Sequence, residues 1–239
     1  MPKKNRDRIF FISDMHIDRW DRDRKSAFLE FIDYVQAHAI ELYVLGDIFD
    51  FPALKGESIW PRHKDVIMRL RALPEQGVPL TYLIGNHDIS LRGIEIKDDG
   101  FEITYCDSKR PLIRNFFGHT VYMEHGHYYD PLFQEHVYDA IDFLKSLTGT
   151  HVDVRMTDFL RDMVRIFQRN PKNKEAAAKK MNAEERPEIG VPERFLKLWE
   201  QAAEQLIKKM RYDVVMFGHT HAPVIRKMLT GDQFYVNTG

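Results

Sequence analysis

The sequence predicts an α/β fold built around one sizeable hydrophobic core. The chain has 239 residues, 44% of them hydrophobic, which is enough to bury such a core. Short β-branched or aromatic runs, typical of strands buried on both faces, alternate with segments of helical periodicity. Each run ends abruptly at a cluster of Gly, Asp, Asn or His. In an α/β sheet the carboxyl ends of the strands meet at one edge, so we expect these clusters to converge.

The predicted strands and helices follow one another along the chain. The strands cover residues 8–13, 41–45, 80–84, 120–124 and 213–217. Helices are predicted over 24–38, 63–73 and 191–210, because apolar residues recur there at helical spacing. The inward residues are Phe28, Phe31, Ile32 and Val35 in the first helix and Val66, Ile67, Leu70 and Leu73 in the second. Pro74, Gly77 and Pro79 end the second helix.

Charge and cysteine content narrow the class of protein. The 35 basic and 36 acidic residues leave a formal net charge of −1, which argues against a protein that coats nucleic acid. The single cysteine, Cys106, rules out an internal disulfide and a thiolate cluster, and it is expected to be a small buried hydrophobe. No segment has a signal-peptide core or the roughly 18 apolar residues of a membrane span. These features predict a cytoplasmic protein.

The polar clusters contain the side chains of a metal site. They read DMH (14–16), GDIFD (46–50), GNHD (85–88), EHGH (124–127) and GHTH (218–221). Together they offer carboxylate oxygen, amide oxygen and imidazole nitrogen without sulfur, a set that suits Mn, Fe, Co or Zn. In extended chain, residues i and i+2 point to the same side, so both members of DxH and of HxH can face one site. The candidate ligands are Asp14, His16, Asp47, Asn86, His125, His219 and His221.

Seven candidate ligands are too many for one ion, which rarely takes more than six protein ligands. Two ions that share the Asp47 carboxylate accommodate all seven, and such a pair can clamp both oxygens of a phosphoryl transfer. Taken singly, each motif has an ordinary structural interpretation: Asp47 as a cap, Asn86 in a turn, His125 as a satisfied buried histidine. The occurrence of five ligand-rich clusters, each after an apolar run, favours the metal site.

The ordered motifs DxH, GDxxD, GNHD, an isolated His and GHxH, from Asp14 to His221, resemble those of the calcineurin-like metallophosphoesterase superfamily. The resemblance implies a four-layer sandwich of two mixed β-sheets flanked by helices, formed by residues 1–239 as a single domain. It also implies two divalent ions, with Mn preferred over Fe, Zn or Co, and a metal-bridging hydroxide as the nucleophile. By this similarity, one ion is held by Asp14, His16, Asp47 and His221 and the other by Asp47, Asn86, His125 and His219.

His87 is assigned to chemistry rather than to metal binding. Beside the ligand Asn86, its imidazole can stabilise phosphoryl oxygens or protonate the leaving oxygen, and the Asp50 carboxylate can orient it. The alternative is that His87 only packs beside the centre. Asp88 is expected to support the site or its turn.

About ninety residues of helical character separate EHGH from GHTH. An insertion at this place, predicted over 128–210, resembles the helical lid of UDP-2,3-diacylglucosamine diphosphatases. Residues 151–182 carry 8 Lys or Arg against 4 Asp or Glu. A basic amphipathic helix there suits an acidic lipid headgroup, with peripheral contact to the inner membrane, although a helix with a solvated basic face fits equally well. Candidate substrate contacts are His127, Arg161 and Arg165.

Two positions depart from these diphosphatases, which carry Arg in place of His87 and Asp in place of His127. The leading hypothesis is a dimetal phosphoesterase that hydrolyses a phosphoester or pyrophosphate bond, with UDP-2,3-diacylglucosamine or a related nucleotide-activated glycolipid as substrate. The alternatives are a soluble phosphodiesterase or nucleotidase and, in a different class, a non-catalytic metal-binding scaffold like the retromer subunit that has this fold. No nucleic-acid partner is expected, because no basic and aromatic track is evident.

Overall fold

The computed structural model describes residues 6–49, 59–91, 96–98, 100–107, 109–130, 191, 193–228 and 231–239. Asp50, Arg161, Arg165 and most of the insertion predicted over 128–210 lie outside these residues. The predictions made for them therefore stay predictions.

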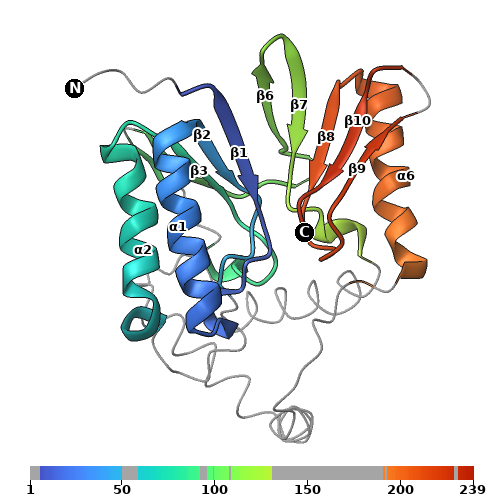
Figure 1. The fold of residues 1–239 in the computed structure, drawn as a ribbon. Helices are drawn as coiled ribbons and strands as arrows, with labels where there is room; N and C mark the ends of the chain where they lie inside the picture. The colour runs from blue at the N-terminus through green and yellow to red at the C-terminus, as the bar shows by residue number, and fades with distance from the viewer. Residues whose placement is uncertain are drawn as a thin grey trace, which may run out of the picture.

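The first sheet carries the amino-terminal half of the chain. Its strand order is β1-β2-β3-β5-β4, from β1 (Arg8–Ile12), β2 (Ala39–Val44), β3 (Leu80–Leu83), β5 (Phe101–Thr104) and β4 (Ile96–Asp98). The first four strands run parallel and β4 is antiparallel to β5. Helices α1 (Arg22–His38) and α2 (Ile59–Glu75) lie against one face of this sheet (Figure 1). The short 3-10 helices η1 (Ile17–Arg19) and η3 (Ile89–Leu91) follow β1 and β3.

The second sheet has the order β6-β7-β8-β10-β9. Its strands are β6 (Leu112–Phe116), β7 (His119–Met123), β8 (Val214–Phe217), β10 (Phe234–Asn237) and β9 (Val224–Lys227). The three central strands are parallel and both edge strands are antiparallel to their neighbours. Helix α6 (Glu193–Met210) covers its outer face, and η4 (His127–Tyr129) follows β7. The sheet therefore has the mixed character that the resemblance implied.

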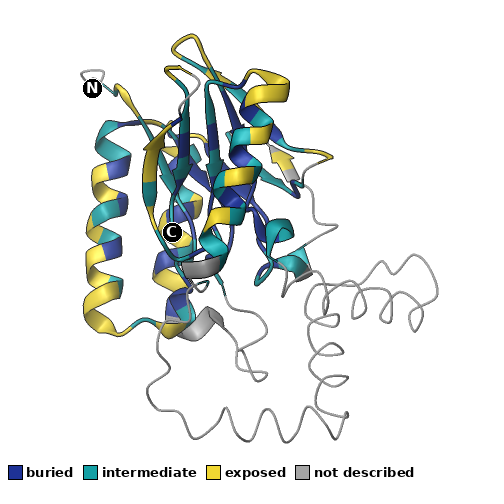
Figure 2. Ribbon diagram, turned by 90° about the vertical axis from the view of Figure 1, so that its right-hand side faces the viewer, coloured by how far each residue is buried: buried dark blue, intermediate teal, exposed yellow. Residues whose placement is uncertain are grey.

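The predicted helices form for the expected reasons. Asp21 caps α1 by accepting a hydrogen bond from the Arg24 backbone N–H at 2.8 Å, which satisfies one of the free amides of the first turn. The buried face of α1 carries Phe28, Ile32 and Val35, and Figure 2 shows the exposed residues along its other side. Helix α2 buries Val66, Leu70 and Leu73 and ends one residue after Pro74. Both helices begin earlier than predicted.

Strand alternation explains the four layers of Figure 1. In β1, Phe10 and Ile12 pack toward α1 and α2, whereas Ile9 and Phe11 pack between the sheets. A strand with apolar residues on both faces requires a layer on each side. The same alternation in β8 places Val215 and Phe217 against α6 and Val214 and Met216 between the sheets.

Three apolar cores thus separate helices, sheet, sheet and helix, and the predicted fold class is confirmed. Cys106 is buried in the middle core, as expected, and burial raises the pKa of its thiol to about 12. Among the described residues, no helix has the length and apolar content needed to cross a bilayer. The boundaries predicted for the insertion stay untested, although η4 and α6, at its two ends, contact each other.

Candidate metal centre

The seven candidate ligands all follow parallel strands at their carboxyl ends. Asp14 and His16 follow β1, Asp47 follows β2, and Asn86 follows β3. In the second sheet, His125 follows β7, while His219 and His221 follow β8. Since the two sheets face each other, loops from both meet at one end of the molecule. The structure therefore brings together ligands that lie more than 200 residues apart in the sequence, such as His16 and His221.

The backbone at these positions is unusual. Five candidate ligands are non-glycine residues with positive φ: Asp14 (54°), His16 (43°), Asp47 (57°), His219 (72°) and His221 (53°). This left-handed region is unfavourable for side-chain-bearing residues, and it persists only where surrounding contacts enforce it. Such strain gathers at functional sites, and here it turns successive side chains toward the same point.

Hydrogen bonds between the loops supply the enforcing contacts. The backbone N–H of Asp14 donates to the Gly46 carbonyl at 3.0 Å, and that of His16 donates to the Asp47 carbonyl at 3.1 Å. Across the two sheets, the His219 backbone N–H donates to Asp14 Oδ2 at 2.9 Å. These hydrogen bonds tie the loops to one another.

Close approach requires glycine at positions 46, 85 and 218. A Cβ atom on Gly46 would lie 2.6 Å from His125 Nδ1, and the φ of Gly46 is +95°. A Cβ atom on Gly218 would lie 2.8 Å from Asp14 Oδ2. Both distances are shorter than real Cβ contacts, so a larger residue at either position would displace a candidate ligand.

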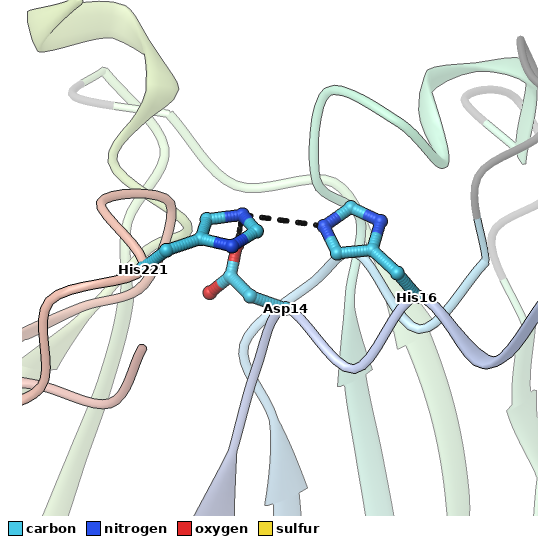
Figure 3. A group of neighbouring side chains, drawn as sticks. All are labelled: Asp14, His16 and His221. Atoms are coloured by element: carbon cyan, nitrogen blue, oxygen red, sulfur yellow. Dashed lines mark hydrogen bonds and ion pairs between the residues drawn. The ribbon is translucent and has the colours of Figure 1, made fainter. Parts of the chain in front are cut away.

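The first ligand group consists of Asp14, His16 and His221, whose ligand atoms lie within 4.8 Å of one another. His16 Nε2 and His221 Nε2 are 3.3 Å apart, and His221 Nε2 is 3.7 Å from Asp14 Oδ1. Figure 3 shows the two imidazoles pointing toward each other from opposite loops, with the Asp14 carboxylate beside His221. Burial is the largest cause that lowers the pKa of His16, to about 4, so its ring is neutral and able to bind metal.

The second ligand group consists of Asp47, Asn86, His125 and His219. The Oδ1 atom of Asn86 lies 2.9 Å from His125 Nε2 and 2.8 Å from His219 Nδ1. His125 Nε2 is also 3.1 Å from Asp47 Oδ2. Asp47 lies between the groups, because its carboxylate is also close to His16 and His87.

The chemistry of the second group fits a cation. His125 Nδ1 lies 2.7 Å from the Leu45 carbonyl, which only accepts, so Nδ1 carries a hydrogen and donates it. In the neutral ring, the Nε2 lone pair then faces two further acceptors, Asn86 Oδ1 and Asp47 Oδ2. Acceptors that converge in this way repel one another unless positive charge lies among them.

The pKa values point to the same need for positive charge. Burial by itself lowers the pKa of His125, but the carboxylates of Asp47 and Asp14 outweigh it and raise that pKa to about 10. The pKa of Asp14 is raised to about 7, first by burial and then by the Asp47 charge. A divalent ion bound here would supply the positive charge that the raised pKa values of His125 and Asp14 indicate.

Asp88 supports the loop that presents Asp47. Its buried carboxylate accepts hydrogen bonds from the backbone N–H of Asp47 at 2.5 Å, from that of Phe49 at 3.2 Å and from the Tyr82 hydroxyl at 2.8 Å. This geometry agrees with the supporting role expected for Asp88 and holds Asp47 in its left-handed conformation.

His87 lies at the first ligand group. Its backbone N–H donates to Asp47 Oδ1 at 2.8 Å, and its ring centroid is 4.8 Å from that of His16, with the rings nearly perpendicular. A ligand atom of His87 falls within 4.8 Å of those of His16 and Asp47. The side chain is therefore within reach of a group bound between the two ligand groups.

Three residues near the site were not predicted from the sequence. Asp130 Oδ2 lies 2.9 Å from His219 Nε2, Trp199 donates from Nε1 to the Gly126 carbonyl at 2.8 Å, and Asn237 Nδ2 donates to the Gly218 carbonyl at 3.0 Å. Local spacing gives no sign of any of them, because each contact joins distant parts of the chain. His127 is fully buried, with its ring 5.4 Å from that of His125, and its contact with substrate stays a prediction.

The two sheets and the convergent carboxylate, amide and imidazole groups define an α/β protein with a candidate metal centre. A match to the calcineurin-like phosphoesterase family covers residues 7–223, and the chain belongs to that family. The protein is thus a metal-dependent phosphoesterase, in agreement with the prediction from its motifs.

Individual relatives share modest identity over most of the chain. The UDP-2,3-diacylglucosamine hydrolase of Aeromonas hydrophila is 27% identical over 236 residues, covering 94% of this chain and 90% of that protein. The protein of the same name from Pseudomonas fluorescens is 24% identical over 229 residues, covering 94% and 84%. Among solved structures, Vacuolar Protein Sorting 29 from Cryptosporidium parvum aligns with a TM-score of 0.43 and 12% identity, covering 97% of this chain and 72% of that one.

Proposed function

We propose that the protein uses two divalent cations to hydrolyse the pyrophosphate bond of a nucleotide-activated glycolipid, UDP-2,3-diacylglucosamine or a close relative. The observation that carries the proposal is the pair of ligand groups that meet at the Asp47 carboxylate. Proteins named for hydrolysis of UDP-2,3-diacylglucosamine, similar along most of the chain, support the choice of substrate.

The proposed ligands divide along the two groups. One cation is held by Asp14, His16, Asp47 and His221 and the other by Asp47, Asn86, His125 and His219. Bound there, two cations would activate water for attack on phosphorus and offset the charge that develops on the phosphoryl oxygens. The donor set suits Mn²⁺, and Fe, Zn or Co are accommodated by the same atoms.

The chain's own residues orient the reaction. Asp88 holds the backbone N–H of Asp47, and the backbone N–H of His87 donates to Asp47 Oδ1, so that the carboxylate keeps one orientation between the groups. The His87 imidazole lies beside the same carboxylate and can donate a hydrogen bond to a phosphoryl oxygen or a proton to the leaving oxygen. We propose that Asp50 orients this imidazole and that Arg161, Arg165 and His127 contact the substrate.

The leaving group decides which role of His87 matters. Hydrolysis of the UDP-glycolipid adds water across the P–O–P bridge and yields UMP and the glycolipid 1-phosphate. A phosphate leaving group is stable as an anion near neutral pH, since its second pKa is about 6. With this substrate His87 therefore serves mainly the phosphoryl oxygens, whereas an alkyl phosphoester would need its proton.

A second candidate function is a soluble phosphodiesterase or nucleotidase. It is favoured by one observation: a histidine stands at position 87, beside the Asp47 carboxylate, where it can protonate an alkoxide leaving group. A general acid at this place is worth most for esters with poor leaving groups.

The experiment that separates the two candidates supplies the Mn-loaded protein with UDP-2,3-diacylglucosamine and, in parallel, with a bis-aryl phosphodiester. Metal-dependent release of UMP is expected from the first substrate. Cleavage of the diester without any UMP would retain the dimetal chemistry, exclude the glycolipid and favour the second candidate. Hydrolysis of neither substrate would remove both proposals in favour of the scaffold.

A further inference from the structure

The imidazole of His219 has a different partner at each of its nitrogens. Nε2 lies 2.9 Å from Asp130 Oδ2, and Nδ1 lies 2.8 Å from Asn86 Oδ1. Both side chains are largely buried: 9% of the His219 side chain and 13% of the Asp130 side chain are exposed. The ring therefore connects the second ligand group to a carboxylate on its far side.

These two partners determine the tautomer of His219. A carboxylate only accepts hydrogen bonds, so the ring must carry its hydrogen on Nε2 and donate it to Asp130. The neutral ring then keeps its lone pair on Nδ1, directed at the position shared with Asn86 Oδ1.

The position of Asp130 is itself fixed by the turn that follows β7. Asp130 closes the short helix η4, with its backbone N–H donating to the His127 carbonyl at 3.2 Å. Trp199 of α6 binds the same turn through the Gly126 carbonyl, and its ring centroid lies 5.7 Å from that of His219. The ring of His125 contacts His219 edge-on at 5.2 Å. The imidazole is thus held by packing as well as by the hydrogen bond.

We propose that Asp130 is a positioning residue for the second metal position: it selects the Nε2–H tautomer of His219 and aims Nδ1 at the cation. The inference rests on the proposed dimetal function. It deepens that function, because Asp130 lies outside the five sequence motifs and yet supports one of the two metal positions. A carboxylate that orients a ligating histidine raises the basicity of the ring, and loss of such a partner typically weakens metal binding 10- to 100-fold.

The test measures metal affinity rather than turnover, and isolates each position by a background substitution. In a His221→Ala background, Mn²⁺ binds the second group, and in a His125→Ala background it binds the first. Asp130→Asn is then added to each and Mn²⁺ is titrated by calorimetry. We choose Asn because its amide can donate to Nε2 and so favour the wrong tautomer.

The expected result is selective. Asp130→Asn should weaken Mn²⁺ binding by about 10- to 100-fold at the second group and leave the first group within about twofold. The matched control is Asp232→Asn, which removes an exposed aspartate paired only with a surface lysine and should change neither affinity. Unchanged affinity at the second group would overturn the proposal, and an equal loss at both groups would do so too, since that is the mark of a folding defect.

A second measurement needs no variant at position 130. In the Zn-loaded wild-type protein with ¹⁵N-labelled histidine, NMR should show His219 with its hydrogen on Nε2 and its metal bond on Nδ1. The opposite tautomer would refute the role of Asp130. Neither readout involves the glycolipid, so a protein that shows both results yet releases no UMP would contradict only the proposed substrate.

Discussion

The two ligand groups differ in how firmly their imidazoles are held. In the second group, His125 donates to the Leu45 carbonyl and His219 lies against Asp130, so each ring has a fixed partner behind it. In the first group, Nδ1 of His16 has no hydrogen-bond partner among the described residues. The side chain of His221 is 23% exposed, whereas that of His125 is fully buried.

This difference indicates a division of labour. Ligands oriented in advance lose less conformational freedom when a metal binds, and so they bind it more tightly. The second group therefore resembles a permanent site, while the first, where His221 is partly exposed, is better suited to exchange of metal, water and substrate. Among the described residues, the carboxylate of Asp47 lies close to ligand atoms of both groups.

The largest effect is expected from Asp47→Asn, which should weaken metal binding at both ligand groups. An amide would leave the buried site with one negative charge fewer and no bridging carboxylate, so both positions should bind Mn²⁺ poorly and turnover should fall below detection. Metal content by mass spectrometry and UMP release measure the two effects. Retention of both metals with near-normal turnover would show that the groups work independently.

A smaller loss is expected from His87→Ala. This variant should keep both metals and lower the hydrolysis rate by about 10²-fold. If His87 also protonates an alkoxide leaving group, the loss on an alkyl phosphodiester should exceed the loss on the pyrophosphate, whose phosphate leaving group needs no proton. Full activity on both substrates would remove the catalytic assignment, and loss of one metal would make His87 a ligand of the first group.

The Mn²⁺ affinities of the two ligand groups can be compared directly. We expect two separable Mn²⁺ affinities in the wild-type protein, differing by about tenfold or more, with the tighter one abolished by His125→Ala and the weaker one by His221→Ala. Calorimetric titration of the three proteins is sufficient. If the tighter site is retained in His125→Ala, the order of the two Mn²⁺ affinities is the reverse of the one inferred from the hydrogen bonds.

The smallest expected effect is a decrease in tryptophan fluorescence. The Trp199 ring lies 5.7 Å from that of His219, so occupation of the second position by paramagnetic Mn²⁺ should quench tryptophan fluorescence. Trp199→Phe serves as the control, because it leaves Trp20 and Trp60 in place. If quenching persists in this variant, the signal does not come from the second position.

The sequence predicted the ligand clusters because strand and loop chemistry are local. Apolar runs with residues for both faces predicted strands buried on two sides, and their ends carried Asp, Asn and His. The division into two sheets could not be predicted in this way, since β6, β9 and the edge strand β4 are short and only half-apolar. The hairpin from β6 to β7 left one usable sign in the sequence, Gly118. In the structure Phe117 and Gly118 both adopt positive φ, as in a two-residue turn that favours glycine.

The contacts of the supporting residues escaped prediction for a different reason. Asp88 was expected to support the site, but its partner Asp47 lies 41 residues away, and Asp130, which was not predicted, lies 89 residues from His219, so neither contact has a local pattern. The pairing of His16 with His221 likewise follows from the packing of one sheet on the other. Sequence spacing can thus identify the ligands, while the atoms that orient them emerge only from tertiary structure.

The left-handed backbone at five ligand positions has a consequence for the life of the protein in a cell. Each such residue raises the free energy of the folded chain by about 1–3 kcal/mol. A cation that binds only the folded state offsets part of this cost, because it stabilises that state by about 2.7 kcal/mol at a concentration 100 times its dissociation constant. The amount of intact protein should therefore follow the supply of metal, so that scarcity removes the enzyme by proteolysis as well as by inactivation.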